Sequence, residues 1–204
     1  MTIQQQIQAI ESHDLLLKQI ENPDYQVQLA AVRKDGYQIR YIENPSLELQ
    51  LEAVRQYPQS IFYIKNPCKE VQVTAIHSYP YMINDDFCEE AQLEAIHCAG
   101  RLIKYIKHPS KRLQLECIKA WPYHIRYIEN PCEEALFLAV LLDGKAIENI
   151  QNPSIALQLE AISQNAENIH FIKNPCLEAR MKILKKNPNF FQTLQDNDAL
   201  EYLI

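Results

Sequence analysis

Residues 44–65 read NPSLELQLEAVRQYPQSIFYIK, and the same pattern recurs along most of the chain. Successive copies begin 22 residues apart, except for one interval of 20 residues between residues 66 and 86. A fixed period of this length indicates a repeat array, in which each unit buries apolar surface against its neighbours. Pro follows the first residue of every copy except one, where Asp86 precedes Phe87; the copies begin at Asn22, Asn44, Asn66, Asp86, His108, Asn130, Asn152 and Asn174.

Each copy predicts one long helix and one short helix, and we number its positions from zero at the Asn. Asn before Pro is held out of the α region and suits an N-cap, and Pro is favourable as the first helical residue. We therefore expect the long helix to begin at the Asn-Pro pair and to run for about twelve residues. It should end before the Gly or Pro at position fourteen, as at Gly36 and Pro58. The segment that follows is long enough for only one or two turns of α or 3₁₀ helix.

Apolar residues fill positions five, seven, nine and ten of the long helix, and position nine is Ala in most copies. These positions span an arc of roughly 200°, wider than a one-sided amphipathic stripe. Each helix should therefore contact neighbours on both flanks. The chain is predicted to be all-α, a right-handed α-solenoid of about nine stacked units. We expect a single domain over residues 1–204, with an N-terminal capping unit at 1–21, eight repeats at 22–186 and a C-terminal cap at 187–204.

Composition excludes several classes of function. Lys and Arg number 20 against 26 Asp and Glu, and the net charge of −6 disfavours generic affinity for a nucleic-acid backbone. The first residues, MTIQQQIQAIESHD, lack the basic start and apolar core of a signal peptide. The longest apolar run, residues 135–142, is too short to cross a bilayer. We expect a cytoplasmic protein without membrane contact. Four of the six Cys share position two with Ser, which indicates free thiols at helix starts: Cys68, Cys88, Cys132 and Cys176.

The string NP-S/C-x-E-x-Q-L-x-A-I/V, followed by a Gly or Pro break and an Ile-x-Tyr-Ile segment, resembles HEAT-like α-solenoids. It is most similar to the leucine-rich repeat variant, whose repeats alternate α and 3₁₀ helices, and it also resembles 22-residue repeats of bacterial and phage proteins. The resemblance covers nearly the whole chain and brings no catalytic motif. It implies a binding scaffold.

A column of Gln occupies position six, in the middle of the apolar arc. A buried amide must be hydrogen-bonded, or it costs about 1–3 kcal/mol. One interpretation is a Gln ladder that lines a binding groove. The other, which we favour, is a structural amide that bridges to the backbone of an adjacent loop between helices. The column consists of Gln28, Gln50, Gln72, Gln92, Gln114 and Gln158.

Aromatic and basic residues recur on the short segments, and we call this set the ridge. Tyr and Arg dominate the hot spots of protein interfaces, so the ridge is a candidate contact surface. Packing between loops and short helices is the alternative explanation. Tyr beside Arg could also stack on a base, which is the mechanism expected of a nucleotide or nucleic-acid binder. The ridge consists of Tyr41, Tyr63, Tyr105, Tyr127 and Phe171 with Arg40, Lys104 and Arg126.

The repeat at 130–144 departs from the polar pattern. Leu138, Leu141 and Leu142 occupy positions that are polar in most other copies, and Leu136 replaces the Gln. We call Leu138, Leu141 and Leu142 the patch, and we expect Phe137 beside them to be a core residue. An apolar patch among polar neighbours is a candidate site for a partner or for self-association through residues 136–142. Coverage by a bend or by the C-terminal cap is the alternative.

Two further patterns carry expectations. Glu at positions four and eight lies near basic residues at position eleven, which predicts pairing between residues three apart on a solvated face. A mixed-charge track for a protein partner, or a mimic of nucleic-acid charge, is the alternative. The short copy that begins at Asn66 lacks two residues of its second segment and ends in Asn84, Asp85 and Asp86. We expect a kink or a change of pitch there.

No constellation of catalytic residues is present. His77, His97 and Cys98 lack a fourth ligand and the spacing of a zinc site, and three Gly in all leave no glycine-rich phosphate loop. We therefore expect no enzyme, no metal and no cofactor. The sequence favours a protein-binding scaffold that uses the ridge and the patch. The alternatives are a nucleic-acid or nucleotide binder, and a phage-type inhibitor of a host defence complex.

Overall fold

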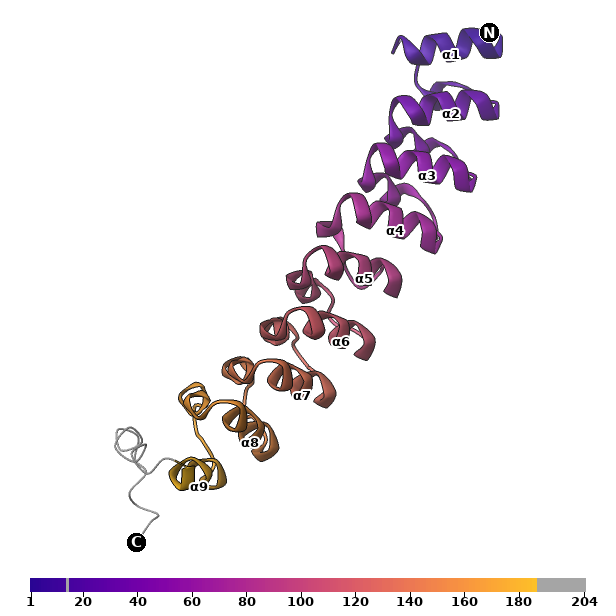
Figure 1. The fold of residues 1–204 in the computed structure, drawn as a ribbon. Helices are drawn as coiled ribbons and strands as arrows, with labels where there is room; N and C mark the ends of the chain where they lie inside the picture. The colour runs from indigo at the N-terminus through magenta and orange to yellow at the C-terminus, as the bar shows by residue number, and fades with distance from the viewer. Residues whose placement is uncertain (14, 187–204) are drawn as a thin grey trace. The chain divides into compact units, whose positions relative to one another are not determined.

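A computed structural model describes residues 1–13 and 15–186, and these residues form α-helices and 3₁₀ helices with no β-strand among them. The expected all-α class, with one long and one short helix per repeat, is confirmed (Figure 1). The chain divides into two compact units, the first ending at His108 and the second beginning at Pro109. The predicted C-terminal cap at 187–204 lies outside the described residues.

The two kinds of helix alternate strictly. The first unit contains α1 (Ile3–Glu11), η1 (Leu17–Gln19), α2 (Tyr25–Lys34), η2 (Gly36–Tyr41), α3 (Leu47–Gln56), η3 (Pro58–Tyr63), α4 (Lys69–Ser78), η4 (Pro80–Met82), α5 (Glu89–Cys98) and η5 (Gly100–Tyr105). The second contains α6 (Lys111–Ala120), η6 (Pro122–Tyr127), α7 (Glu133–Leu142), η7 (Gly144–Asn149), α8 (Ile155–Gln164), η8 (Ala166–Phe171) and α9 (Leu177–Lys186). Within each unit every long helix packs against the next one.

The long helices begin later than expected. The prediction that Asn caps the helix and Pro begins it is wrong, because the cap is the residue at position two. The hydroxyls of Ser46, Ser110 and Ser154 each accept a hydrogen bond from the backbone N–H three residues on, at 3.2 to 3.4 Å. The Asn-Pro pair therefore belongs to the loop. Three of its Asn residues have left-handed backbones with φ of 48° to 50°, which Asn tolerates better than most residues: Asn22, Asn66 and Asn152.

The short segments are 3₁₀ helices, six residues long in most repeats. Three residues make one turn of a 3₁₀ helix, so side chains three apart lie on one face. The two Ile of each six-residue segment have this spacing. Both are buried in most of these repeats, as at Ile103 and Ile106, while Ile42 is partly buried. In the short copy η4 has only three residues, in agreement with the two missing positions. The change of pitch expected there stays a prediction.

The N-terminal segment forms a helical unit that differs from the repeats, with α1 followed by the three-residue η1. Thr2 and Gln5 make a capping box at the start of α1, in which each side chain bonds the backbone N–H of the other. Ile10 of α1 and Leu17 of η1 then join Val27 and Ala31 in one buried cluster. The first 21 residues thus bury the outer flank of α2. No helix among the described residues is long and apolar enough to cross a bilayer.

Glycine at position fourteen marks a close approach between a 3₁₀ helix and the next long helix. A Cβ atom on Gly36 would lie 2.6 Å from the carbonyl oxygen of Ala53. A Cβ atom on Gly144 would lie 2.3 Å from Asn168 Nδ2 and 3.1 Å from the carbonyl oxygen of Ala161. The start of one 3₁₀ helix therefore rests on the backbone of the following repeat.

We expect Gly144→Ala to destabilise the protein by about 1–3 kcal/mol, because the added methyl group overpacks the contact with Asn168. Urea unfolding measures the change. Asn168→Ala should relieve the clash, so the double variant should be more stable than Gly144→Ala alone. The preceding repeats already combine a residue that has a Cβ atom with an Ala at the two equivalent positions, Pro122 and Ala146. Equal stability of Gly144→Ala and the double variant would contradict this account.

Candidate functional site

The Gln column is engaged with the backbone. Five of its amides donate from Nε2 to the carbonyl of the Pro five residues before, at 2.8 to 3.0 Å: Gln28, Gln50, Gln72, Gln114 and Gln158. The sixth, Gln92, donates to Asn84 O at 3.2 Å. In three copies Oε1 also accepts from the N–H of the Cys that caps the next long helix, at 2.6 to 2.8 Å. These contacts are the ones that a bridging structural amide makes.

We expect Gln114→Leu to lower the free energy of unfolding by about 1–3 kcal/mol, because it leaves Pro109 O and Cys132 N without their partner. Chemical denaturation measures the loss. Native hydrogen exchange adds a local test, since the Cys132 amide should lose protection. Unchanged protection of Cys132 would show that the bridge does not hold the start of α7.

In the first unit Arg40 of the ridge contacts aromatic rings of two consecutive repeats. Arg40 lies 4.4 Å above the ring of Tyr63, and its Nε donates to Tyr37 O at 2.8 Å. Tyr37 in turn stacks on Tyr57 with ring centroids 5.0 Å apart. The sequence placed Arg40 and Tyr63 on one surface, and the structure brings them into direct contact. Tyr41 lies 5.8 Å from the same guanidinium and is exposed.

The other residues of the ridge also contact neighbouring side chains or backbone. Lys104 lies 4.8 Å from the ring of Tyr105. In the second unit Arg126 donates to Tyr123 O at 3.1 Å, Tyr127 contacts the His124 ring, and Phe171 lies 5.9 Å from Lys145 Nζ. Arg40, the best-placed cation, is thus already stabilised by its own tyrosines. The residues of the ridge thus contact neighbouring rings, cations or backbone carbonyls, and the role of the ridge in binding stays a prediction.

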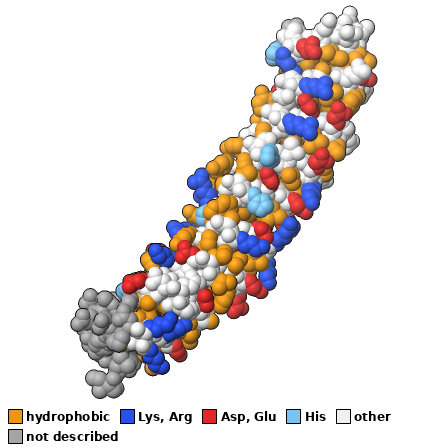
Figure 2. All heavy atoms as spheres, viewed as in Figure 1, with side chains coloured by type: hydrophobic (Ala, Val, Ile, Leu, Met, Phe, Trp, Pro, Cys, Tyr) orange, Lys and Arg blue, Asp and Glu red, His pale blue; other side chains and the backbone are white. Residues whose placement is uncertain are grey.

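Charged residues on the long helices pair mostly between neighbouring repeats. Lys69 bonds Glu90 and Lys111 bonds Glu134, each at 2.6 Å, and Arg33 lies 3.7 Å from Glu52. Lys119 and Glu116 on α6 show the expected spacing of three residues. The hydrogen bond between Lys111 and Glu134 raises the pKa of the lysine and lowers the pKa of the glutamate. Figure 2 shows both signs of charge interspersed on the visible face.

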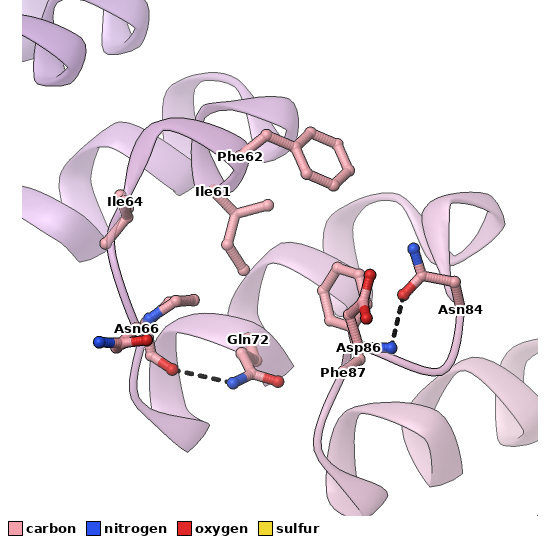
Figure 3. Close-up of a pocket in the computed structure, with 9 residues that line it drawn as sticks. Ile61, Phe62, Ile64, Asn66, Gln72, Asn84, Asp86 and Phe87 are labelled. Carbon is pink, nitrogen blue, oxygen red and sulfur yellow. Dashed lines mark hydrogen bonds between the residues drawn. The ribbon is translucent and has the colours of Figure 1, made fainter.

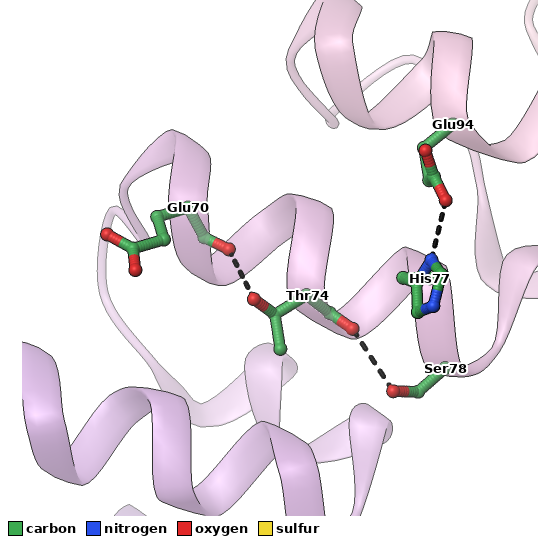
Figure 4. A network of polar contacts seen from close by, with 5 residues as sticks. All are labelled: Glu70, Thr74, His77, Ser78 and Glu94. Atoms are coloured by element: carbon green, nitrogen blue, oxygen red, sulfur yellow. Dashed lines mark hydrogen bonds and ion pairs between the residues drawn. The ribbon is translucent and has the colours of Figure 1, made fainter.

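One of these pairs joins α4 to α5. Near the end of α4, His77 Nδ1 lies 2.6 Å from Oε1 of Glu94 on α5 (Figure 4). In the same helix Thr74 and Ser78 each donate a hydroxyl hydrogen bond to the carbonyl four residues before. His77 is therefore part of a contact between repeats. Among the described residues no group of three or more His, Cys, Asp and Glu side chains could hold a metal ion.

The patch lies on α7 and is larger than the sequence predicted. Leu141 and Leu142 are exposed, with 53% and 49% of their surface accessible, while Leu138 is half-buried. The prediction that Phe137 is a core residue is wrong, since 41% of it is exposed. Position seven lies at the edge of the buried arc. Neighbouring residues cover a smaller side chain such as Leu51 at this position, but the bulky ring of Phe137 extends into solvent.

Phe137, Leu138 and Leu141 line a hollow on the second unit. It has a volume of about 520 Å³ and mainly apolar walls of Leu115, Phe137, Leu138 and Leu141. Lys119, Glu133 and Glu134 complete the lining. The volume falls in the range of ligand sites, and the apolar character is typical of a recess that accepts an apolar side chain. We call this recess the α7 hollow.

A second recess lies in the first unit, beside the shortened η4. It has a volume of about 470 Å³ and lies between η3 and the loop that precedes α5 (Figure 3). Ile61, Ile64 and Phe87 supply apolar walls, and Asn84 and Asp86 supply polar groups. The sequence marked residues 84–86 as irregular but did not predict a recess. We call it the η4 pocket.

All six cysteines are free thiols in the structure. Cys117 occupies position nine and is fully buried, and burial raises its pKa to about 12. Burial and the nearby Glu94 also raise the pKa of Cys98. A thiol with a raised pKa is a weak nucleophile at neutral pH, so neither residue has the environment of a reactive cysteine.

We expect the stability of the protein to fall between pH 9 and pH 12 through Cys117. Above pH 9 the unfolded thiol loses its proton, while the folded thiol keeps it up to about pH 12. The stabilisation is therefore complete below pH 9 and is lost as the pH rises. Cys117→Ala restores the residue most common at this position and should remove about 1 kcal/mol of the change between pH 8 and pH 10. Identical pH profiles of the parent and Cys117→Ala in urea unfolding would contradict the assignment.

Comparison of the chain with protein-family models, with curated proteins and with solved structures finds no match. The resemblance to HEAT-like and leucine-rich-repeat-variant solenoids stays a prediction.

Proposed function

We propose that this chain is a non-enzymatic scaffold that binds another protein through the α7 hollow. The observation that supports the proposal is the apolar character of α7 on all sides. Residues 135–142 are apolar without interruption, yet Phe137, Leu141 and Leu142 face solvent. A helix that is apolar all round is normally buried, so an exposed one indicates a surface that a partner covers.

The size of the surface suits an anchoring contact. Burial of a large apolar side chain contributes about 1.5–3 kcal/mol. On α7, Phe137 and Leu141 line the recess, and Leu142 is a third exposed apolar side chain of the same helix. Exposed Ile155, Leu177 and Met181 on α8 and α9 add apolar area in the same unit. The occupant we propose is a protein segment with an apolar anchor residue. Self-association through residues 136–142 is the alternative occupant.

The proposal includes a specific architecture. It is a single right-handed solenoid of about nine units in the cytoplasm. The regular alternation of long α-helices with six-residue 3₁₀ helices supports it within each unit.

A nucleic-acid or nucleotide binder is the second candidate, and it would use the ridge. The net charge of −6 and the engagement of Arg40 with its own tyrosines weigh against it. Salt dependence separates the two classes, because phosphate contacts weaken steeply with salt and apolar contacts do not. An inhibitor of a host defence complex would be one case of protein binding.

We expect Leu141→Glu with Leu142→Glu to abolish binding of the partner and to leave the fold intact, because both side chains are exposed. Proteins captured from cells of the source organism by the parent chain and by the variant are compared by quantitative mass spectrometry. Sedimentation velocity of the purified chains tests self-association in parallel. Both carboxylates would oppose burial in an apolar contact, so the loss of affinity should exceed tenfold, or about 1.4 kcal/mol.

Arg55→Glu with Gln56→Glu is the matched control. These residues hold the same two positions on α3, are exposed, and add the same two carboxylates outside the hollow. The control should keep the partner. Unchanged capture and unchanged oligomeric state in the α7 variant would refute the proposal.

A further inference from the structure

The η4 pocket exists because one repeat is two residues short. In the other repeats, from η2 to η8, the 3₁₀ helix has six residues and is followed by a second Ile, but η4 ends after three residues. The loop of Asn84, Asp85 and Asp86 then leads directly to α5. Asn84 Oδ1 accepts the Asp86 N–H at 2.9 Å, and Asp85 Oδ1 accepts the N–H groups of Lys107 and His108. The loop is thus held in a defined shape.

Three residues that depart from the repeat pattern meet at this pocket. Phe62 occupies position eighteen, which is charged or His in the other full copies from Asn22 to Phe171. Asp86 occupies position zero, which is otherwise Asn or His, and Phe87 replaces the Pro. The repeat architecture requires none of these three residues, yet all of them line one recess (Figure 3).

The chemistry of the pocket is that of a site for a cation with an apolar stem. Phe87 is buried in its wall, and Phe62 is 61% exposed beside it. The Asp86 carboxylate has no hydrogen-bonding or ionic partner among the residues that the structure describes. Position eighteen carries a basic residue in three other copies, at Arg40, Lys104 and Arg126, but here it carries Phe62. The pocket therefore has an aromatic ring and an anion without the cation that the ridge supplies elsewhere.

We propose that the η4 pocket binds a basic side chain, arginine foremost, of a protein partner. The aliphatic stem would pack on Ile61 and Phe87, the guanidinium would lie over Phe62, and the Asp86 carboxylate would accept its hydrogen bonds. The chain already contains such a contact, since Arg40 lies 4.4 Å above Tyr63. This inference goes beyond the proposed function, because the pocket and the α7 hollow belong to different units and each can fail without the other.

The test is a ¹H–¹⁵N NMR titration of the full chain with N-acetyl-arginine methylamide. N-acetyl-citrulline methylamide is the matched probe, since it has nearly the same shape without the charge. The arginine probe should shift the amides of Asn84, Asp86 and Phe87. The citrulline probe should bind at least fivefold more weakly, as expected for loss of an ion pair in a partly enclosed site.

Two variants assign the contacts. Asp86→Asn restores the residue most common at this position, so it should fold normally and weaken the arginine probe about fivefold. Phe62→Leu keeps an apolar surface but removes the ring face, and it should weaken the probe about threefold. Glu43→Gln removes an exposed carboxylate from the loop before Asn44 and should change nothing.

Three outcomes would overturn the proposal. The first is equal binding of the citrulline and arginine probes. The second is unchanged arginine binding by Asp86→Asn. The third is the absence of shifts at Asn84, Asp86 and Phe87 up to the solubility limit of the arginine probe. The α7 variant should bind the arginine probe like the parent chain, so failure here is distinct from failure of the proposed function.

Discussion

Close approach between the backbone of one repeat and the 3₁₀ helix of the repeat before it is the contact on which the rest of the structure depends. From α2 to α8, position nine holds only Ala or Cys, and these residues are fully buried. The carbonyl oxygens of two of them, Ala53 and Ala161, would lie 2.6 and 3.1 Å from a Cβ placed on the glycine that begins the preceding 3₁₀ helix. Larger side chains at position nine would separate the layers. The pairs of Ile on the short helices and the Val and Ile at position ten could then no longer share one core.

Polar contacts between repeats depend on this close approach of neighbouring repeats. The amides of Gln72, Gln114 and Gln158 each tie a Pro carbonyl of their own repeat to the first turn of the next long helix. Ion pairs such as Lys69 with Glu90 span the same boundary on the outside. A repeat in isolation would leave these groups unpaired and its flanks exposed. Stability is therefore shared between neighbours, as expected of a quasi-one-dimensional array.

The two surfaces proposed for binding both lie where the pattern is broken. On α7, Leu residues replace polar ones at exposed positions, and the sequence predicted that surface through Leu138, Leu141 and Leu142. It did not predict that Phe137 joins them, because position seven lies at the edge of the buried arc, where Leu51 and Leu93 are buried but Phe137 and Met181 are exposed. The ridge, in contrast, does not lie where the pattern is broken. Its residues follow the period, and the structure engages Arg40 with Tyr37 and Tyr63, a contact between consecutive repeats that spacing alone does not reveal.

The sequence by itself determined the repeat, the two helices of each copy and the buried positions, because period and apolar spacing follow directly from the geometry of a helix. It also indicated a backbone partner for the Gln column, since an amide in an apolar arc requires one. Only the tertiary structure decided that Ser46 rather than Asn44 caps a helix, because an Asn-Pro pair in the loop and an N-cap two residues later leave the same period. Only the tertiary structure brought Phe62, Asp86 and Phe87 to one pocket. Helical spacing specifies the direction of a side chain around its own axis, whereas a pocket depends on the distance to the next element, and two missing residues changed that distance.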